Sequence, residues 1–211
     1  MKSCLQPFLL SVGLVCLLGV GPARAADPDT AALATMVSVQ TVNFGSAQAP
    51  GGGAWGEVDV ELSIKPVGSR QWADRVKVTL AIAYSVDEGG KTSVKSYRAT
   101  AEAVSLEAGG SPHFRFYLPP EVIKEYKLKD TADYYGIEIT VGGVKLPPTK
   151  KNASSKLDTP DKLSHLLASG TENNGILLPQ SLSPFAHDTN KSAPSFVRAE
   201  GAAGGAAASA E

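Results

Sequence analysis

Hydrophobic and polar residues alternate along two central segments of the chain with the period of two that is typical of β-strands with one buried face. In residues 55–65, one face collects Val58, Val60, Leu62 and Ile64. In residues 75–84, one face collects Val76, Val78, Leu80, Ile82 and Tyr84. The intervening positions include Glu57, Asp59 and Glu61 in the first segment and Arg75 and Lys77 in the second. Each segment is therefore predicted to bury one face and expose the other.

Turn-forming residues separate further segments of this kind at intervals of about ten residues, which is the spacing of a sandwich or barrel. Glycines mark most of these turns, and Gly142-Gly143 suits a tight two-residue hairpin. The other predicted strands are residues 36–44, 93–100, 101–106, 113–118 and 134–141. A helical turn is predicted over residues 119–126, because Pro120 suits a first helical position.

The predicted fold class is all-β. We expect an immunoglobulin-like antiparallel β-sandwich of about seven strands, with one short helical turn between strands and a C-terminal extension that contains one short helix. The residues assigned a structural role in its core are Val60, Leu62, Val78, Leu80, Phe116 and Ile137. All of them lie on the apolar face of a predicted strand.

The first 25 residues have the features of a secretory signal peptide. Lys2 supplies a positive charge, residues 8–18 form an apolar stretch too short for a membrane span, and Ala23-Arg24-Ala25 fits a signal-peptidase site. We therefore expect a mature chain that begins at Ala26, is exported to the periplasm, the outer surface or the medium, and is not integral to the membrane. Both cysteines lie in the predicted signal peptide, so residues 26–211 form no disulfide.

The predicted domain organisation follows from changes in composition. We expect a signal peptide at 1–25, an N-terminal linker at 26–34, the sandwich at 35–147, a C-terminal extension at 148–200 and a disordered Ala/Gly-rich tail at 201–211. Removal of the signal peptide takes away Lys2 and Arg24 and leaves 18 basic and 21 acidic side chains. This slight acidic excess argues against nucleic acid as a partner.

The extension contains apolar residues that are candidates for partner binding. A short helix is predicted behind Thr159 as N-cap and Pro160 as first residue, with leucines at helical spacing. Apolar islands follow in a Pro/Ser/Asn-rich context. The candidate partner-binding residues are Leu166, Leu167, Ile176, Leu177, Leu178, Phe185 and Phe196. Two alternatives stay open: these residues pack on their own domain, or they remain exposed for another protein.

No constellation of side chains demands a reaction, so no enzymatic activity, catalytic residue, cofactor or metal is expected. The three histidines have no zinc-site spacing, and no nucleophile elbow, Walker loop or dinucleotide fingerprint occurs. Glu57, Asp59 and Glu61 share one parity, which indicates a solvated strand face rather than a glycosidase pair. Trp55 and Trp72 are candidates for stacking on a sugar ring, with core or edge packing as the alternative.

The segment Asp130-Thr131-Ala132-Asp133-Tyr134-Tyr135-Gly136 resembles the approach to strand F of immunoglobulin variable-type domains, with glycine in place of the cysteine. The resemblance implies that Tyr134 is a corner tyrosine whose hydroxyl binds the backbone a few residues upstream. The family's inter-sheet disulfide is absent from this sequence.

A broader resemblance extends over most of residues 35–198. Residues 76–80 (VKVTL), 116–121 (FYLPPE), 174–179 (NGILLP) and 193–198 (APSFVR) are similar to segments of a family of exported bacterial proteins associated with type IV pili. The resemblance implies an immunoglobulin-like fold and a non-enzymatic role.

Three functional classes stay open, of which an enzyme is the third because only export and mature size favour it; the other two are more specific. The first is an exported structural or interaction protein that binds an envelope or pilus protein, in association with type IV pili or their assembly. The alternative is a secreted carbohydrate-binding sandwich in which Trp55 or Trp72 binds the glycan.

Overall fold

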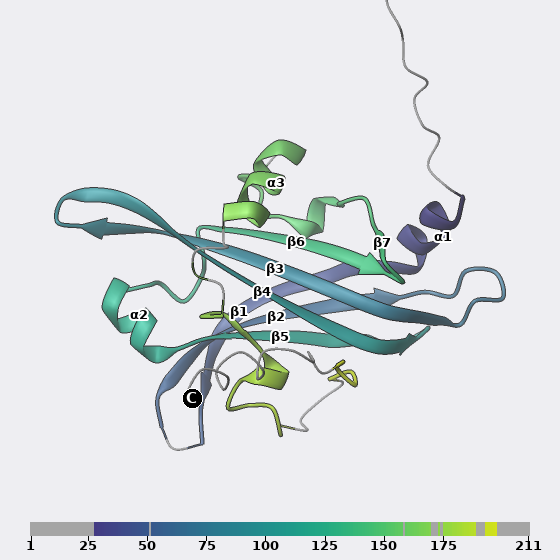
Figure 1. The fold of residues 1–211 in the computed structure, drawn as a ribbon, viewed down its shortest axis with the longest axis horizontal. Helices are drawn as coiled ribbons and strands as arrows, with labels where there is room; N and C mark the ends of the chain where they lie inside the picture. Colours follow the sequence, from purple (N-terminus) through teal and green to yellow (C-terminus); the bar gives the residue numbers. More distant parts are fainter. Residues whose placement is uncertain are drawn as a thin grey trace, which may run out of the picture.

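Two antiparallel four-stranded sheets pack face to face in the computed structural model, which describes residues 28–50, 52–157, 159–169, 173, 175–188 and 193–197 (Figure 1). The strands are β1 (Val37–Gln48), β2 (Ala54–Ile64), β3 (Trp72–Glu88), β4 (Lys91–Glu107), β5 (His113–Leu118), β6 (Tyr134–Val141), β7 (Val144–Lys145) and β8 (Leu178–Pro179). The helices are α1 (Pro28–Met36), α2 (Pro120–Tyr126) and α3 (Pro160–Ser169), with short 3-10 helices η1 (Lys150–Asn152) and η3 (Gln180–Leu182). The predicted signal peptide and the predicted tail lie outside the described residues.

The strand order is that of an immunoglobulin-like sandwich, which confirms the predicted fold class. One sheet has the order β1-β2-β5-β8 and the other β4-β3-β6-β7. With β1, β2 and β5 as strands A, B and E, the second sheet becomes C′-C-F-G. Strand β8 lies beside β5, at the edge that strand D occupies in constant-type domains.

The core lies between the two sheets, where the alternating residues of the central strands meet. The six residues assigned to it are at most 1% exposed: Val60, Leu62, Val78, Leu80, Phe116 and Ile137. They belong to one continuous cluster with residues from both sheets. Burial of this apolar surface is the main stabilising contribution available to a sandwich without disulfides.

Strand β4 is one continuous strand, although residues 93–100 and 101–106 were predicted as two. It pairs with β3 without a register shift from Trp72↔Glu107 to Glu88↔Lys91. The core-facing positions Tyr97, Ala99 and Ala101 keep one parity across the expected break, so nothing turns the chain there. The resulting β3–β4 hairpin extends beyond the other strands at the left of Figure 1.

The predicted hairpin at Gly142-Gly143 is present, but its second strand is very short. Both glycines have positive φ, 56° and 86°, as a tight turn requires. Strand β7 pairs only with Thr140 and Val141. Most of β6 therefore has no strand β7 beside it.

Short helices occupy the positions predicted for two of them. Helix α2 connects β5 to β6, with Pro119 before its first residue, and α3 begins at Pro160 as expected. Part of the segment expected to be a linker, from Pro28 onward, is helix α1. Leu33 and Met36 of α1 are buried in the sandwich core, which accounts for the helical order of this segment.

Helix α3 packs on the outer face of the sheet that contains β3 and β6. Its three leucines, Leu163, Leu166 and Leu167, form a separate cluster with Ala81 and Ala83 of β3. Small residues let the helix approach the sheet closely. A Cβ atom added to Gly136 of β6 would lie 2.5 Å from Leu163 Cδ1.

Tyr134 also lies on this outer face, which corrects the role inferred from strand F. Its ring packs with the α3 cluster and lies 5.3 Å from Lys156 Nζ. The position that matches the missing cysteine, Gly136, faces α3 rather than the opposite sheet. Tyr135 is the residue that points inward, with its ring 5.8 Å from that of Phe44. The local sequence match therefore has the wrong parity for a corner tyrosine.

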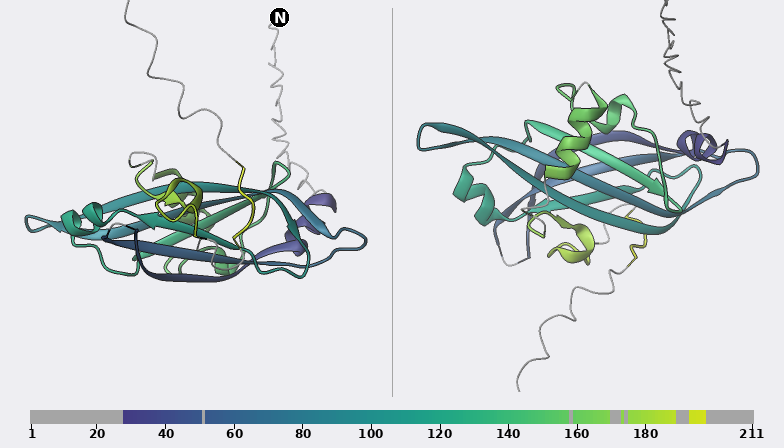
Figure 2. Two further views of the ribbon diagram at one scale, coloured as in Figure 1. Left: turned by 90° about the horizontal axis from the view of Figure 1, so that it is seen from below. Right: turned by 45° about the horizontal axis from the view of Figure 1, so that its top comes forward.

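The C-terminal strap, defined as residues 176–188 and 193–197, closes the side of the sandwich between β5 and β4. Residues Leu178 and Pro179 pair with Tyr117 and Phe116. Farther along, Val104 N–H donates to Ser195 O at 2.9 Å and Val197 N–H donates to Glu102 O at 2.7 Å. The strap and α3 lie on opposite sides of the strands in Figure 2. The strap covers parts of two sheet edges that would otherwise present unpaired backbone groups.

Leu80→Ala is expected to lower the free energy of unfolding by about 2–5 kcal/mol, because Leu80 is fully buried and the substitution leaves a cavity. Denaturant titration measures the change. The matched control is Val94→Ala in the same sheet, where the side chain is 59% exposed and the expected change stays within about 0.5 kcal/mol. A Leu80→Ala cost below about 1 kcal/mol would contradict the assigned core.

Gly136→Val is expected to destabilise the protein by about 1–3 kcal/mol, because the new side chain collides with Leu163 and forces α3 off the sheet. The control is Gly45→Val in β1, where an added Cβ has no atom within 4 Å. Thermal and denaturant unfolding of both variants provide the comparison. Equal stability of the two variants would show that α3 does not dock against Gly136.

Candidate interaction groove

A wide groove lies between strand β1 and the segment that follows β7. Its volume is about 1110 Å³. Residues 40–44 of β1 form one wall, and residues 148–157 with the start of α3 form the other. We call this hollow the β1 groove. It exists because β7 ends after two residues, so the chain does not continue along β6 as a full strand G.

The floor of the β1 groove is apolar. Val42, Phe44 and Tyr135 belong to the partly buried shell around the core, and Leu157 and Leu163 line the groove from the α3 side. The rings of Phe44 and Tyr135 meet at 5.8 Å and bridge the two sheets. Desolvation by burial raises the pKa of Tyr135 above its ordinary value, so the phenol stays neutral at physiological pH.

Asn152 fixes the polar rim of the groove. Its Nδ2 donates to Ile137 O at 3.1 Å, and its Oδ1 accepts from the N–H of Thr149 at 2.9 Å and from its hydroxyl at 2.6 Å. Ser154 N–H donates to Tyr135 O at 3.0 Å. These bonds hold residues 149–154 against the edge of β6, where Asn152 is buried.

Two lysines stand on this rim. Lys150 and Lys151 line the groove and are exposed. Lys151 Nζ donates to Gln40 O on β1 at 2.9 Å, so one lysine spans the groove from rim to strand. Among the described residues that line the groove, none is acidic. The rim is therefore positive.

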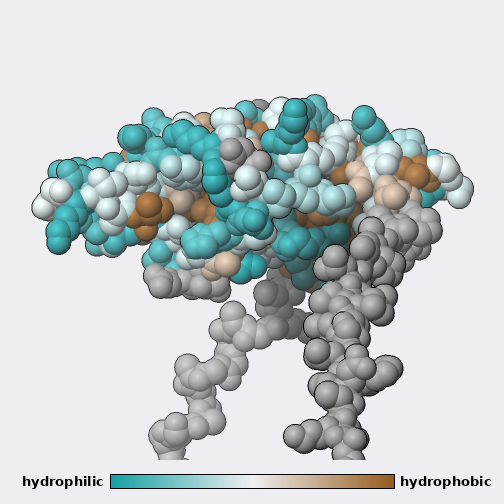
Figure 3. All heavy atoms as spheres, turned by 90° about the horizontal axis from the view of Figure 1, so that it is seen from above, coloured by the Kyte–Doolittle hydropathy of each residue, from teal (hydrophilic) through white to brown (hydrophobic). Residues whose placement is uncertain are grey.

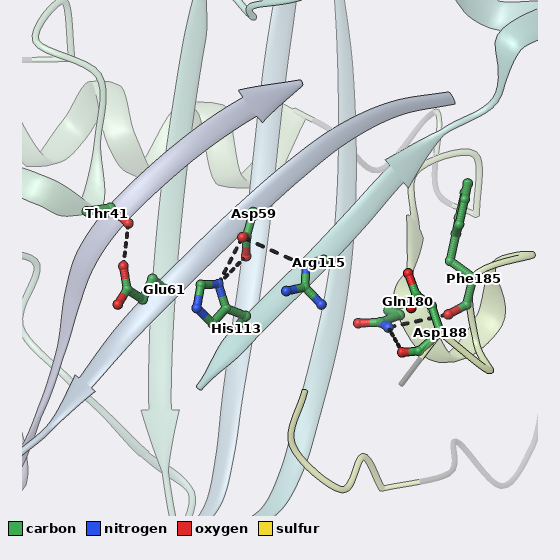
Figure 4. A network of polar contacts seen from close by, with 8 residues as sticks. All are labelled: Thr41, Asp59, Glu61, His113, Arg115, Gln180, Phe185 and Asp188. Atoms are coloured by element: carbon green, nitrogen blue, oxygen red, sulfur yellow. Dashed lines mark hydrogen bonds and ion pairs between the residues drawn. The ribbon is translucent and has the colours of Figure 1, made fainter. Parts of the chain in front are cut away.

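A second polar arrangement lies on the outer face of the sheet formed by β1, β2 and β5 (Figure 4). His113 Nδ1 lies 2.8 Å from Asp59 Oδ2, and Arg115 Nε lies 3.8 Å from the same oxygen. Thr41 Oγ1 donates to Glu61 Oε2 at 2.8 Å. These contacts join neighbouring strands across the sheet. In the described part of the chain, no group of three or more His, Cys, Asp or Glu residues has the geometry of a metal site.

The C-terminal strap buries an aromatic cluster at the end of this face. The ring of Phe185 stacks on that of Tyr117 at 4.3 Å and meets that of Trp55 edge-on at 6.1 Å. Gln180 Nε2 donates to the carbonyls of Phe185 and Asp188 at 3.3 and 3.2 Å. Burial, with a smaller contribution from the charge of Glu57, raises the pKa of Tyr117 above its ordinary value.

Most candidate partner-binding residues pack on their own domain. Leu166 and Leu167 are on the buried face of α3 against β3, and Leu177 and Phe185 of the strap are buried. Ile176, Leu178 and Phe196 are partly buried, with the Phe196 ring 5.7 Å from that of Phe114. The structure thus places the extension against the sandwich rather than in solvent. These side chains do not form a free surface for another protein.

The two tryptophans of the carbohydrate hypothesis lie far apart in the fold. Trp55 is near the start of β2 and is partly covered by Phe185, whereas Trp72 follows the end of β2 and begins β3. They therefore stand at opposite ends of the sandwich and do not form one platform. Trp72 is 51% exposed, so it is the more accessible of the two for stacking on a sugar ring.

On the face drawn in Figure 3, hydrophilic residues predominate and hydrophobic residues form small separate patches. The large apolar residues that are clearly exposed within the described ranges are Trp72, Val94, Val104 and Leu182. Helices of the described residues are all too short or too polar to cross a membrane.

Sequence reasoning did not identify the β1 groove. Its residues come from β1, β6 and the segment 148–160, which are far apart in the sequence and share no motif. One signal was present: Pro147 and Pro148 follow the Gly142-Gly143 hairpin closely, and proline is disfavoured within a paired strand. That signal predicts a short strand G, but not what fills its place.

The comparisons with known proteins show the fold. No protein-family model and no curated protein matches this chain. A crystal structure of a protein from Akkermansia muciniphila is similar, with a TM-score of 0.57 and 13% sequence identity. The alignment covers 78% of this chain and 94% of that one. The likeness extends over nearly the whole solved chain, so the two proteins share the sandwich fold.

Phe185→Ala is expected to lower the pKa of Tyr117 toward the ordinary value of about 10, because it removes the ring that shields the phenol. Titration of phenolate absorbance, with Tyr117→Phe as a subtraction, measures the shift. Leu182→Ala is the control, since Leu182 belongs to the same strap but is 63% exposed. An unchanged Tyr117 titration in Phe185→Ala would contradict the stacked arrangement.

Burial of Tyr117 also makes the free energy of unfolding depend on pH in the alkaline range. The raised folded-state pKa of Tyr117 means that the unfolded chain loses this proton first. The stabilising contribution is therefore complete below about pH 10 and decreases as the pH rises toward the folded-state pKa.

Proposed function

We propose that this chain is a non-enzymatic exported protein that binds other proteins of the cell envelope, in association with type IV pili or their assembly. The observation that carries the binding role is the β1 groove, an apolar hollow with a positive rim beside an open sheet edge. Edge strands and apolar grooves of this kind are typical sites for peptide segments of partners. Export is inferred from the signal peptide predicted at residues 1–25.

The association with pili is supported by the sequence segments that resemble the exported family. Three of the four segments come together in the fold. Phe116 and Tyr117 of the second segment pair with Pro179 and Leu178 of the third, and Phe196 of the fourth lies against Phe114, just before the second. Three of the segments that carry the resemblance therefore meet where the strap docks on β5. It supports a shared architecture that includes the C-terminal extension.

Affinity purification from the producing bacterium tests this proposal. The full-length protein with a C-terminal tag is produced in its own host, cross-linked in intact cells and purified from envelope extracts, and the captured proteins are identified by mass spectrometry. We expect enrichment of a type IV pilus subunit or assembly protein relative to an unrelated exported protein with the same tag. Enrichment of neither would contradict the pilus association.

A further inference from the structure

We infer that the β1 groove binds an extended, acidic segment of a partner protein, which adds as a strand to the open edge of β1. This inference deepens the proposed function, because it names the chemistry of the segment that the protein recognises. It depends on three features of the groove: an edge without a strand partner, an apolar floor and a positive rim.

Strand β1 is open along one edge. It pairs with β2 from Val37↔Ile64 to Gln48↔Ala54, and no other described strand pairs with it. The backbone groups of alternate residues along the other edge are therefore available to an added strand. A register shift between Val39 and Thr41 marks where the regular edge begins. Residues 41–48 beyond it form an edge long enough for a strand of ordinary length.

The opposite edges of the two sheets are less accessible to a partner. The C-terminal strap pairs with Phe116 and Tyr117 on β5 and bonds to Glu102 and Val104 on β4. A partner strand at these positions would first have to displace the strap, which packs on Tyr117 through Phe185. The β1 groove needs no such displacement.

The floor of the groove suits one face of an extended peptide. Val42, Phe44 and Tyr135 present apolar surface that the sandwich itself covers only in part. In a strand added to β1, every second side chain would point to this floor, and the side chains between would point to solvent and the rim. Apolar residues at alternate positions would therefore fit the groove.

The rim selects the charge of the peptide. Lys150 and Lys151 face the groove, and no acidic residue appears in its described lining. Lys151 Nζ now donates to Gln40 O. A partner carboxylate would take over this ammonium group, and a partner N–H would replace it on the Gln40 carbonyl. This exchange frees the Gln40 carbonyl for the added strand and pairs the Lys151 ammonium with the carboxylate of the partner.

Binding of synthetic peptides to the mature protein tests the inference. The probes are fluorescent peptides of about nine residues, a usual strand length, with alternating Val and Glu or with alternating Val and Lys. We expect the Val/Glu peptide to bind about fivefold more tightly in low salt, which corresponds to roughly 1 kcal/mol from two charge contacts of the exposed kind. The Lys150→Glu/Lys151→Glu variant should reverse the preference. The Lys65→Glu/Lys124→Glu variant is the control, because it makes the same charge change at exposed lysines outside the groove.

Hydrogen exchange of the unmodified protein locates the bound peptide independently of any variant. The Val/Glu peptide should slow exchange of backbone amides in residues 41–48, with no added protection at β4. Protection elsewhere, no protection, or equal affinity for the two peptides would overturn the inference. If pilus proteins are captured in cells but the Val/Glu peptide does not bind, the groove assignment alone is overturned. If the peptide binds but no pilus protein is captured, the pilus association alone is overturned.

Discussion

The structure depends on apolar contact between two sheets that no disulfide cross-links. Residues 26–211 contain no cysteine, so the inward faces of β2, β3, β5 and β6 must hold the sandwich by packing alone. Val60 and Leu62 from one sheet and Val78 and Leu80 from the other are fully buried. Such a core needs alternating strands of sufficient length and protection from water at its open sides.

The C-terminal extension supplies that protection. On one side, the strap carries Leu177 and Phe196 to the gap between β5 and β4. On the other, residues 149–154 lie along β6 where strand G is cut short. Helix α3 covers a third surface, the outer face of β3 and β6. The extension therefore completes the domain, and it also reduces the sheet edges through which such domains aggregate.

The sequence predicted those features that depend on residues close together in the chain. Alternation at Val58–Ile64 and Val76–Tyr84 predicted the central strands and their buried faces, glycines predicted the turns, and Pro160 with three leucines predicted α3. The core assignment of Ile137 already gave Tyr134 the opposite parity on β6, so the strand-F resemblance conflicted with the alternation beside it. Long-range choices were not readable. The apolar islands at Leu177 and Phe185 do not say which strand they will cover. The groove joins segments whose proximity only the topology creates.

Buried Asn152 has a consequence for how the protein is produced. Asn152-Ala153-Ser154 matches the acceptor pattern for N-linked glycosylation, yet in the fold its amide is committed to Ile137 and Thr149. A eukaryotic secretory host that attached an oligosaccharide during translocation would place a large polar branch where the chain must close against β6. Recombinant material for structural work is better prepared in a bacterial periplasm, or with this acceptor removed at Ser154.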